Sequence, residues 1–171
     1  MKKHFSLHIF ILPLVAALFL ISAIEVSAEV KAGYTAPGFA LEDINGKTVS
    51  LSSFKGKPVL LNFWATWCPY CRKERAHLSS LYEKYREKDL VVISISTDSS
   101  VEKLKRFMKD NPAPFIVLSD SGRMAAPKYG IKGLPTSFLV DRNGKVVREL
   151  VGYRPWTDKY LTDIIDGLVV K

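Results

Sequence analysis

The chain has 171 residues and carries 25 lysine and arginine residues against 17 aspartate and glutamate residues, a formal net charge of +8. The basic residues are scattered, form no run of five or more and do not interleave with aromatic residues, which argues against a nucleic-acid-binding surface. There is no internal repeat or low-complexity tract, and the mild positive charge favours solubility or the approach to anionic membrane or partner surfaces.

The first 28 residues have the pattern of an export signal. A positive start, Met1-Lys2-Lys3, precedes an apolar stretch from about Ile9 to Ile24, and Val26-Ser27-Ala28 offers the small residues that suit signal cleavage. We expect cleavage after Ala28; the alternative is an uncleaved membrane anchor, since Phe5 to Ile24 is about long enough to span a bilayer. In both cases residues 29–171 are expected to form one exported domain, in the periplasm or at the outer face of the cytoplasmic membrane.

The first half of this domain alternates strand and helix signals. Phe39–Leu41 and Thr48–Leu51 flank Asn45-Gly46, a strong signal for a hairpin turn. The apolar run Pro58–Thr66 is typical of a strand buried on both faces. A helix is expected to begin at Pro69, because proline is favoured at the first helical position and the apolar residues that follow are spaced to share one side.

The second half continues the alternation. Strands are expected at Leu90–Thr97, Phe115–Leu118, Thr136–Val140 and Lys145–Val151. Helices are expected at Val101–Lys109, Met124–Tyr129 and Trp156–Val169. Strands that alternate with helices predict an α/β fold with a mostly parallel sheet, helices on both faces and antiparallel strands at an edge.

The chain has two cysteines, Cys68 and Cys71, which lie where the Pro58–Thr66 strand passes into the predicted helix. Cysteines at this spacing can close a small disulfide ring, and a thiol at a helix N-terminus lies among unpaired N–H groups that favour the reactive thiolate. The motif therefore indicates thiol–disulfide chemistry. The alternatives are a structural disulfide, which stabilises little across so short a loop, and half of a zinc site, for which only His77 adds a ligand beyond the leader.

Three stretches, Val59–Glu74, Ala36–Lys57 and Ala126–Thr136, carry a family resemblance. Together they resemble the exported thioredoxin-like reductases of the TlpA/ResA/CcmG group. The resemblance implies a thioredoxin-like fold with a central, mostly parallel mixed sheet, helices on both faces, an N-terminal β-hairpin and an extra αβ insertion. It also implies a redox-active Cys68–Cys71 disulfide with no further cofactor and no metal.

Within this resemblance, Cys68 at the helix cap is expected to be the exposed nucleophile, and Cys71, almost one turn inside, the shielded thiol that resolves the mixed disulfide. Glu74 lies on the same side of the helix as Cys71, and the group carries a glutamate here that is linked to the active site. We expect Glu74 to raise the thiol pKa values and to shuttle a proton; the alternative is a solvated glutamate near a helix start. Thioredoxins have a buried aspartate where this chain has Asn62, which favours Glu74 as the acid–base group.

Substrate contacts are expected around Pro135. The resemblance implies that the Leu134–Pro135 peptide bond is cis and that the main chain of Leu134 pairs with an incoming substrate strand, whereas the sequence alone is equally compatible with a trans turn. Trp67, Pro69 and Tyr70 are expected to line the rim of the site.

The leading hypothesis is an exported thiol–disulfide oxidoreductase that reduces protein disulfides, including those of apocytochrome c during cytochrome c maturation. Its partners would be disulfide-containing exported proteins and a membrane thiol donor of the CcdA or DsbD kind, and it would act as a monomer without nucleic acid. Alternatives in the same class are a disulfide oxidase or isomerase and glutaredoxin-like use of glutathione, since Pro69-Tyr70 is familiar from glutaredoxins. A copper-binding assembly chaperone is the alternative of another class, but it would want CxxxC and a distant histidine, and neither is present.

Overall fold

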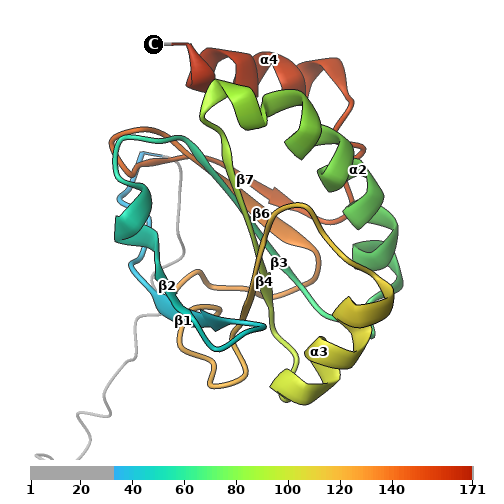
Figure 1. Cartoon of the computed structure of the whole chain (residues 1–171). Coiled ribbons are helices and arrows are strands. Elements are labelled where there is room, and N and C mark those ends of the chain that lie inside the picture. The colour runs from blue at the N-terminus through green and yellow to red at the C-terminus, as the bar shows by residue number, and fades with distance from the viewer. Residues whose placement is uncertain (1–32, 171) are drawn as a thin grey trace, which may run out of the picture.

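The computed structural model describes residues 33–170, so the predicted export signal, cleaved or anchoring, lies outside the described residues. The described part contains one seven-stranded sheet and three α-helices (Figure 1). The strands are β1 (Ala40–Asp43), β2 (Thr48–Ser50), β3 (Val59–Trp64), β4 (Val91–Ser96), β5 (Ile116–Ser119), β6 (Thr136–Val140) and β7 (Val146–Val151). The α-helices are α2 (Pro69–Tyr85), α3 (Val101–Asp110) and α4 (Lys159–Val169), and the short 3-10 helices are η2 (Leu51–Phe54) and η3 (Arg86–Lys88).

The sheet is mixed, with the strand order β2-β1-β5-β4-β3-β6-β7. Strand β4 pairs in parallel with β3 and β5, and the other pairings are antiparallel. The expectation of a mostly parallel sheet therefore holds for the three central strands only. The outer strands form two hairpins, β1–β2 and β6–β7, because a short turn joins antiparallel neighbours whereas a parallel pair needs a crossover.

The α/β fold is as predicted, but the three described α-helices all cover one face of the sheet rather than both faces. The buried apolar side chains of α2, α3 and α4 belong to a single core cluster with Leu60, Val92 and Leu139 of the sheet, and Figure 1 shows α2 and α4 side by side. The cause is the strand order. Strands β3, β4 and β5 lie next to one another in the sheet, in the same order as in the chain, so both crossovers move in the same direction across the sheet. Because crossovers of this kind are right-handed, α2 and α3 lie on the same face.

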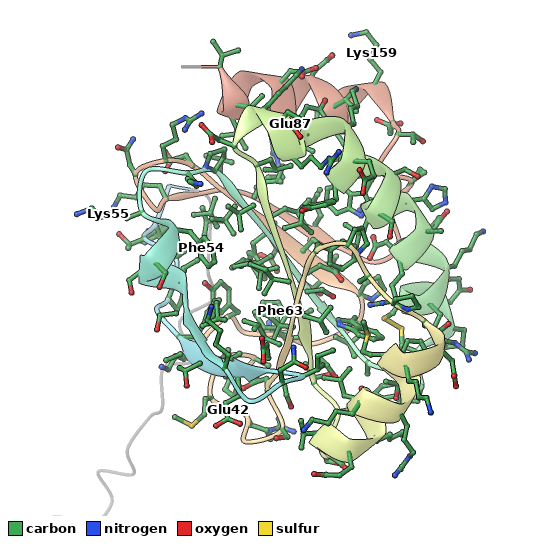
Figure 2. All side chains as sticks on the ribbon, in the orientation of Figure 1. Glu42, Phe54, Lys55, Phe63, Glu87 and Lys159 are labelled. Carbon is green, nitrogen blue, oxygen red and sulfur yellow. A yellow bond between two sulfur atoms is a disulfide. The ribbon has the colours of Figure 1, made fainter. Side chains whose placement is uncertain are left out.

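The opposite face of the sheet is covered by the segment before β1 and by the stretch between β5 and β6. The ring of Phe63 lies fully buried on this face, with centroid distances of 5.1 Å to the ring of Tyr129 and 6.0 Å to that of Phe138. Figure 2 shows Phe63 in the interior of the molecule. A second core cluster therefore fills this side without an α-helix, and Leu51 and Phe54 of the short 3-10 helix η2 pack against it.

The helix predicted at Met124–Tyr129 is wrong, because this stretch folds as successive turns. The buried carboxylate of Asp120 accepts the main-chain N–H groups of Met124, Ala125 and Ala126 at 2.6, 3.0 and 2.7 Å. A side chain that takes N–H groups in this way offers the backbone an alternative to helical bonding.

The other predicted elements are confirmed to within three residues at their ends. The β1–β2 turn uses Gly46 at a φ of +84°, a conformation that glycine adopts without strain. Helix α4 begins at Lys159 rather than at Trp156, since Asp158 caps it by accepting the N–H of Tyr160 at 2.8 Å. Within residues 33–170 no helix combines the length and the apolar character needed to cross a membrane.

Candidate active site

Cys68 and Cys71 form a disulfide at the start of α2, as their spacing allows. Cys68 caps the helix: its Sγ accepts the main-chain N–H of Cys71 at 3.2 Å, and Pro69 takes the first helical position. The two Cα atoms lie 5.3 Å apart. The sulfur of Cys68 therefore lies at the positive end of the helix dipole, which stabilises a thiolate there once the disulfide is reduced.

The disulfide is less accessible than expected. Cys68 is 4% exposed and Cys71 is 1% exposed, so the expectation of an exposed Cys68 is wrong for the disulfide-bonded state, whereas the shielding of Cys71 is confirmed. The cause is packing, because both cysteines belong to the core cluster between the sheet and the helices. The exposed surface here comes from Trp67 and Tyr70, which are 62% and 65% exposed, and from Pro69.

A buried carboxylate fixes the loop that leads into α2. Asp98 accepts the main-chain N–H of Thr66 and the hydroxyl groups of Thr66 and Ser96, each at 2.8 Å. Thr66 and Asp98 follow the parallel strands β3 and β4, whose carboxyl ends meet at the edge where Cys68 lies. Asp98 was not predicted from the sequence, although a carboxylate close behind a buried strand was a signal for it.

The Leu134–Pro135 peptide bond is cis, as the resemblance implied. Antiparallel pairing of β6 with β3 sets Thr136 opposite Phe63, so the loop before β6 lies at the same edge as the cysteines. Pro135 is buried, and its carbonyl accepts the N–H of Gly152 at 2.8 Å. Among the described residues, the main chain of Leu134 has no backbone hydrogen-bond partner. The predicted pairing of Leu134 with a substrate strand therefore stays a prediction that this arrangement permits.

Glu74 is buried, so its interpretation as a solvated surface glutamate is wrong. Only 1% of the residue is exposed, and three donors contact its carboxylate. Asn62 Nδ2 donates to Oε2 at 3.0 Å, while the main-chain N–H of Arg154 and the indole N–H of Trp156 donate to Oε1 at 2.9 and 3.1 Å. Burial raises the pKa of Glu74 from 4.5 to about 7, and the hydrogen bonds from Arg154, Asn62 and Trp156 oppose that rise.

Residues 32–149 match the model of the AhpC/TSA family. The thiol-disulfide oxidoreductase ResA of Bacillus thuringiensis subsp. konkukian is 43% identical over 120 residues, which cover 70% of this chain and 69% of that protein. The chain belongs to the AhpC/TSA family. Within it, the protein is a thioredoxin-like thiol–disulfide oxidoreductase of the TlpA/ResA/CcmG type.

Other relatives and solved structures agree with this assignment. The ResA protein of Bacillus subtilis (strain 168) is 38% identical over 120 residues, 70% of this chain and 67% of that protein. A crystal structure from Chlorobium tepidum, described as a thiol:disulfide interchange protein DsbE, superposes with a TM-score of 0.78 at 37% identity and covers 83% of this chain and 100% of that chain. These similarities confirm the thioredoxin-like fold of the oxidoreductase.

Two contacts of Glu74 in this oxidoreductase were not predicted. Trp156 lies 82 positions along the chain from Glu74, and Arg154 contributes a main-chain group that no sequence motif marks. The contact from Asn62 had a signal, an amide within an otherwise apolar strand. Its Nδ2 also donates to Ser137 Oγ at 3.0 Å, and Ser137 lies directly opposite Asn62 in the β3–β6 register.

Arg75 of the oxidoreductase is buried on another side of α2. Its guanidinium lies 4.5 Å from the ring centre of Trp64, and Nη2 donates to the carbonyl of Asn111 at 3.0 Å and to Met108 Sδ at 3.4 Å. Burial lowers the pKa of Arg75 to about 10, so the group remains a cation at neutral pH. Aromatic and carbonyl contacts thus hold this positive charge at the junction of α2 and α3.

The remaining polar side chains near Glu74 form a small surface group. His77 Nε2 and the hydroxyl of Tyr153 are hydrogen-bonded at 3.0 Å, and Lys73 Nζ lies 4.8 Å from the ring centre of Tyr153. Within residues 33–170, no three His, Cys, Asp or Glu side chains are grouped as ligands for a metal ion.

Proposed function

We propose that this oxidoreductase is exported and acts as a reductant of protein disulfides. The observation that carries the direction of electron flow is the buried carboxyl group of Glu74, on the helix side that also buries Cys71. A carboxylate close to a dithiol disfavours the thiolates, which destabilises the reduced form and gives a low reduction potential. In strong oxidants of the DsbA kind the reduced form is stabilised instead, which gives them a high reduction potential.

The proposed reaction begins with the Cys68 thiolate, which attacks one sulfur of a substrate disulfide. A mixed disulfide forms, and the first substrate sulfur leaves as a thiolate and takes up a proton from water. The Glu74 carboxylate then accepts the proton of Cys71, and the Cys71 thiolate attacks Cys68 Sγ. The second substrate sulfur leaves and receives the proton from Glu74. Two electrons thus pass to the substrate, which becomes a dithiol, while Cys68 and Cys71 become the disulfide.

The proposed substrates are extended, disulfide-containing protein segments. The main chain of Leu134, which has no backbone hydrogen-bond partner within residues 33–170, lies beside the cis-proline Pro135 and suits the addition of one substrate strand. The exposed rings of Trp67 and Tyr70, with Pro69 between the cysteines, give such a segment an apolar surface to contact. The CxxCH disulfide of apocytochrome c is a substrate of this kind, and the role that we propose for the enzyme is therefore cytochrome c maturation.

The proposed location is the periplasm or the outer face of the cytoplasmic membrane, and the support is the export pattern of residues 1–28. A reductant in an oxidising compartment needs electrons from elsewhere. A membrane thiol donor of the CcdA or DsbD kind would reduce the Cys68–Cys71 disulfide after each cycle, which regenerates the dithiol without another cofactor.

The reduction potential tests the proposed direction. Equilibration of residues 29–171 with mixtures of reduced and oxidised glutathione, followed by quantification of the Cys68 and Cys71 thiols, is expected to give a reduction potential near thioredoxin's roughly −270 mV. A value near the roughly −120 mV of DsbA would instead identify a disulfide oxidase. Glutathione disulfide added alone is expected to oxidise the dithiol almost completely.

A further inference from the structure

Two of the three donors to Glu74 come from one short segment between β7 and α4. This clamp segment consists of Gly152–Trp156. Its Arg154 main-chain N–H and its Trp156 indole N–H both donate to Oε1, at 2.9 and 3.1 Å, while Asn62 holds Oε2 from β3. The clamp segment therefore contacts Oε1 of the carboxylate, whereas the sheet contacts Oε2.

The clamp segment is anchored at both ends. At its start, the N–H of Gly152 donates to the carbonyl of Pro135 at 2.8 Å, and Gly152 has a φ of +84°, which favours glycine. At its end, the side chain of Trp156 is fully buried within the core cluster. Between them, the hydroxyl of Tyr153 is hydrogen-bonded to His77 on α2. One segment thus connects the cis-proline loop, the active-site helix and the Glu74 carboxylate.

We propose that Trp156 is a positioning residue for thiol–disulfide exchange, whose indole N–H holds the Glu74 carboxylate ionised and oriented as the proton acceptor for Cys71. The inference rests on the proposed acid–base role of Glu74 and adds the group that prepares it for that role. In this assignment Trp156 acts on the reaction through its hydrogen bond to Glu74.

The physical basis is a balance of two opposed effects on the carboxylate. Burial removes water from Glu74 and disfavours its charged form, whereas each donated hydrogen bond favours that form. With the indole donor removed, Oε1 would keep the Arg154 N–H alone in an equally dry site. The carboxyl group would then hold its proton to higher pH and become a weaker acceptor for the Cys71 proton.

The charged and titratable groups around Glu74 can each affect its measured pKa. On α2 they are Cys71, which is joined to the cap residue Cys68, and His77, which is bonded to Tyr153. The clamp segment adds the guanidinium of Arg154, whose charge lowers the pKa of Glu74. The neighbours from β3 and β6, Asn62 and Ser137, do not titrate. In the disulfide-bonded protein the cysteines do not titrate either, so Glu74 can be followed there without them.

The test compares Trp156→Phe with Trp64→Phe. Both tryptophans are fully buried, but the indole N–H of Trp64 has no hydrogen-bond partner among the described residues, so the control loses similar packing and no contact with Glu74. Titration of the Glu74 side-chain carboxyl carbon by NMR in the oxidised protein is expected to show a rise of about one pKa unit in Trp156→Phe. Trp64→Phe is expected to leave the Glu74 pKa at its wild-type value.

The same variants are expected to differ in the reduced state. Because a protonated Glu74 repels thiolates less, Trp156→Phe is expected to lower the apparent thiol pKa values and to move the pH profile of disulfide reduction, while Trp64→Phe follows the wild type. Equal Glu74 pKa values in Trp156→Phe and the wild type would overturn the proposal, as would equal shifts in the two tryptophan variants.

A measurement on the unmodified protein covers the case in which Trp156→Phe does not fold. The indole N–H resonance of Trp156 is expected to shift with pH through the Glu74 transition near 7, and that of Trp64 is expected not to. A Trp156 resonance that does not shift through this transition would contradict the proposal. Glu74→Gln tests the proposed function separately: unchanged thiol titrations would remove Glu74 from the mechanism even if Trp156 reports its protonation.

Discussion

Glu74 and Arg75, which are consecutive residues of α2, are both buried, have side chains of opposite charge and lie on two different sides of the helix. The carboxylate of Glu74 receives three hydrogen bonds, from β3 and from the clamp segment. The guanidinium of Arg75 contacts Trp64 and the carbonyl of Asn111, and no carboxylate of the described residues pairs with it. A buried charge needs such specific partners because bulk water no longer solvates it. The helix that carries the dithiol is therefore fixed on both sides by polar contacts.

At the same scale, the reactivities of the two cysteines are expected to differ. Cys68 caps the helix and Cys71 lies inside it, so brief iodoacetamide treatment of the reduced protein is expected to alkylate Cys68 about tenfold faster. Mass spectrometry of the digested peptides measures the two rates, with Cys68→Ser and Cys71→Ser as references for each single thiol. Faster modification of Cys71 would reverse the assigned roles of nucleophile and resolving thiol.

The residue-scale predictions from sequence succeeded where a local motif carries the chemistry. The Cys68–Cys71 spacing and the Gly133-Leu134-Pro135-Thr136 loop are each contiguous in sequence, so the disulfide and the resemblance-based cis bond could be predicted. The contacts of Glu74 with Arg154 and Trp156 join positions 80 and 82 residues apart. Such contacts depend on the closed fold, and one sequence contains no periodic signal for them.

At the scale of elements, one carboxylate explains why residues 121–131 are turns. Asp120 follows β5 and accepts the N–H groups of Met124, Ala125 and Ala126. The apolar residues of this stretch still meet the core, since Ala125 and Tyr129 are buried on the face away from the helices. A helix and a series of turns can bury the same side chains and so have similar sequence patterns. The predicted helix at Met124–Tyr129 was wrong for this reason.

Replacement of Asp120 by Ala is expected to destabilise the fold by roughly 3 kcal/mol, because three main-chain N–H groups lose a charged, buried acceptor. Asp141→Ala is the matched control: Asp141 accepts the N–H groups of Asn143 and Lys145 in an exposed turn, where water can replace it. Urea unfolding of both variants measures the difference. Equal losses in the two variants would show that burial does not set the contribution of Asp120.

At the scale of the whole molecule, the active site lies where parallel and antiparallel parts of the sheet meet. Strand β3 pairs in parallel with β4 and antiparallel with β6, so one edge of the sheet collects the end of β3, Asp98 beyond β4 and Pro135 before β6. The strand order that creates this edge also places the described α-helices on one face. The positions of the strands could be predicted from local sequence patterns. The order of the strands in the sheet could not, because it depends on pairing between segments that are distant in sequence.

The raised pKa of Glu74 makes the global stability of the protein depend on pH. The pKa of Glu74 is about 7 in the folded protein against 4.5 as its ordinary value, so between these values the folded state holds a proton that the unfolded state has lost. Stability from this group is therefore fully present below pH 4.5 and is lost as the pH rises through about 7. The total loss is about 3 kcal/mol, and urea unfolding of the oxidised protein at a series of pH values measures it.

Glu74→Gln is expected to remove this pH dependence while the fold is retained. A glutamine Oε1 can accept both donors of the clamp segment, and its amide can donate to Asn62 after the Asn62 side chain rotates, with Ser137 donating to the same Asn62 oxygen. The control is Glu83→Gln on the exposed side of α2, where the carboxylate lies 3.2 Å from Arg86 and is 55% exposed. The difference in unfolding free energy between wild type and Glu74→Gln isolates Glu74, because His77 and the surface carboxylates contribute equally to both proteins. A difference that does not change between pH 4.5 and 8 would mean that Glu74 is ionised throughout, and a buried acid–base group at this position would then be excluded.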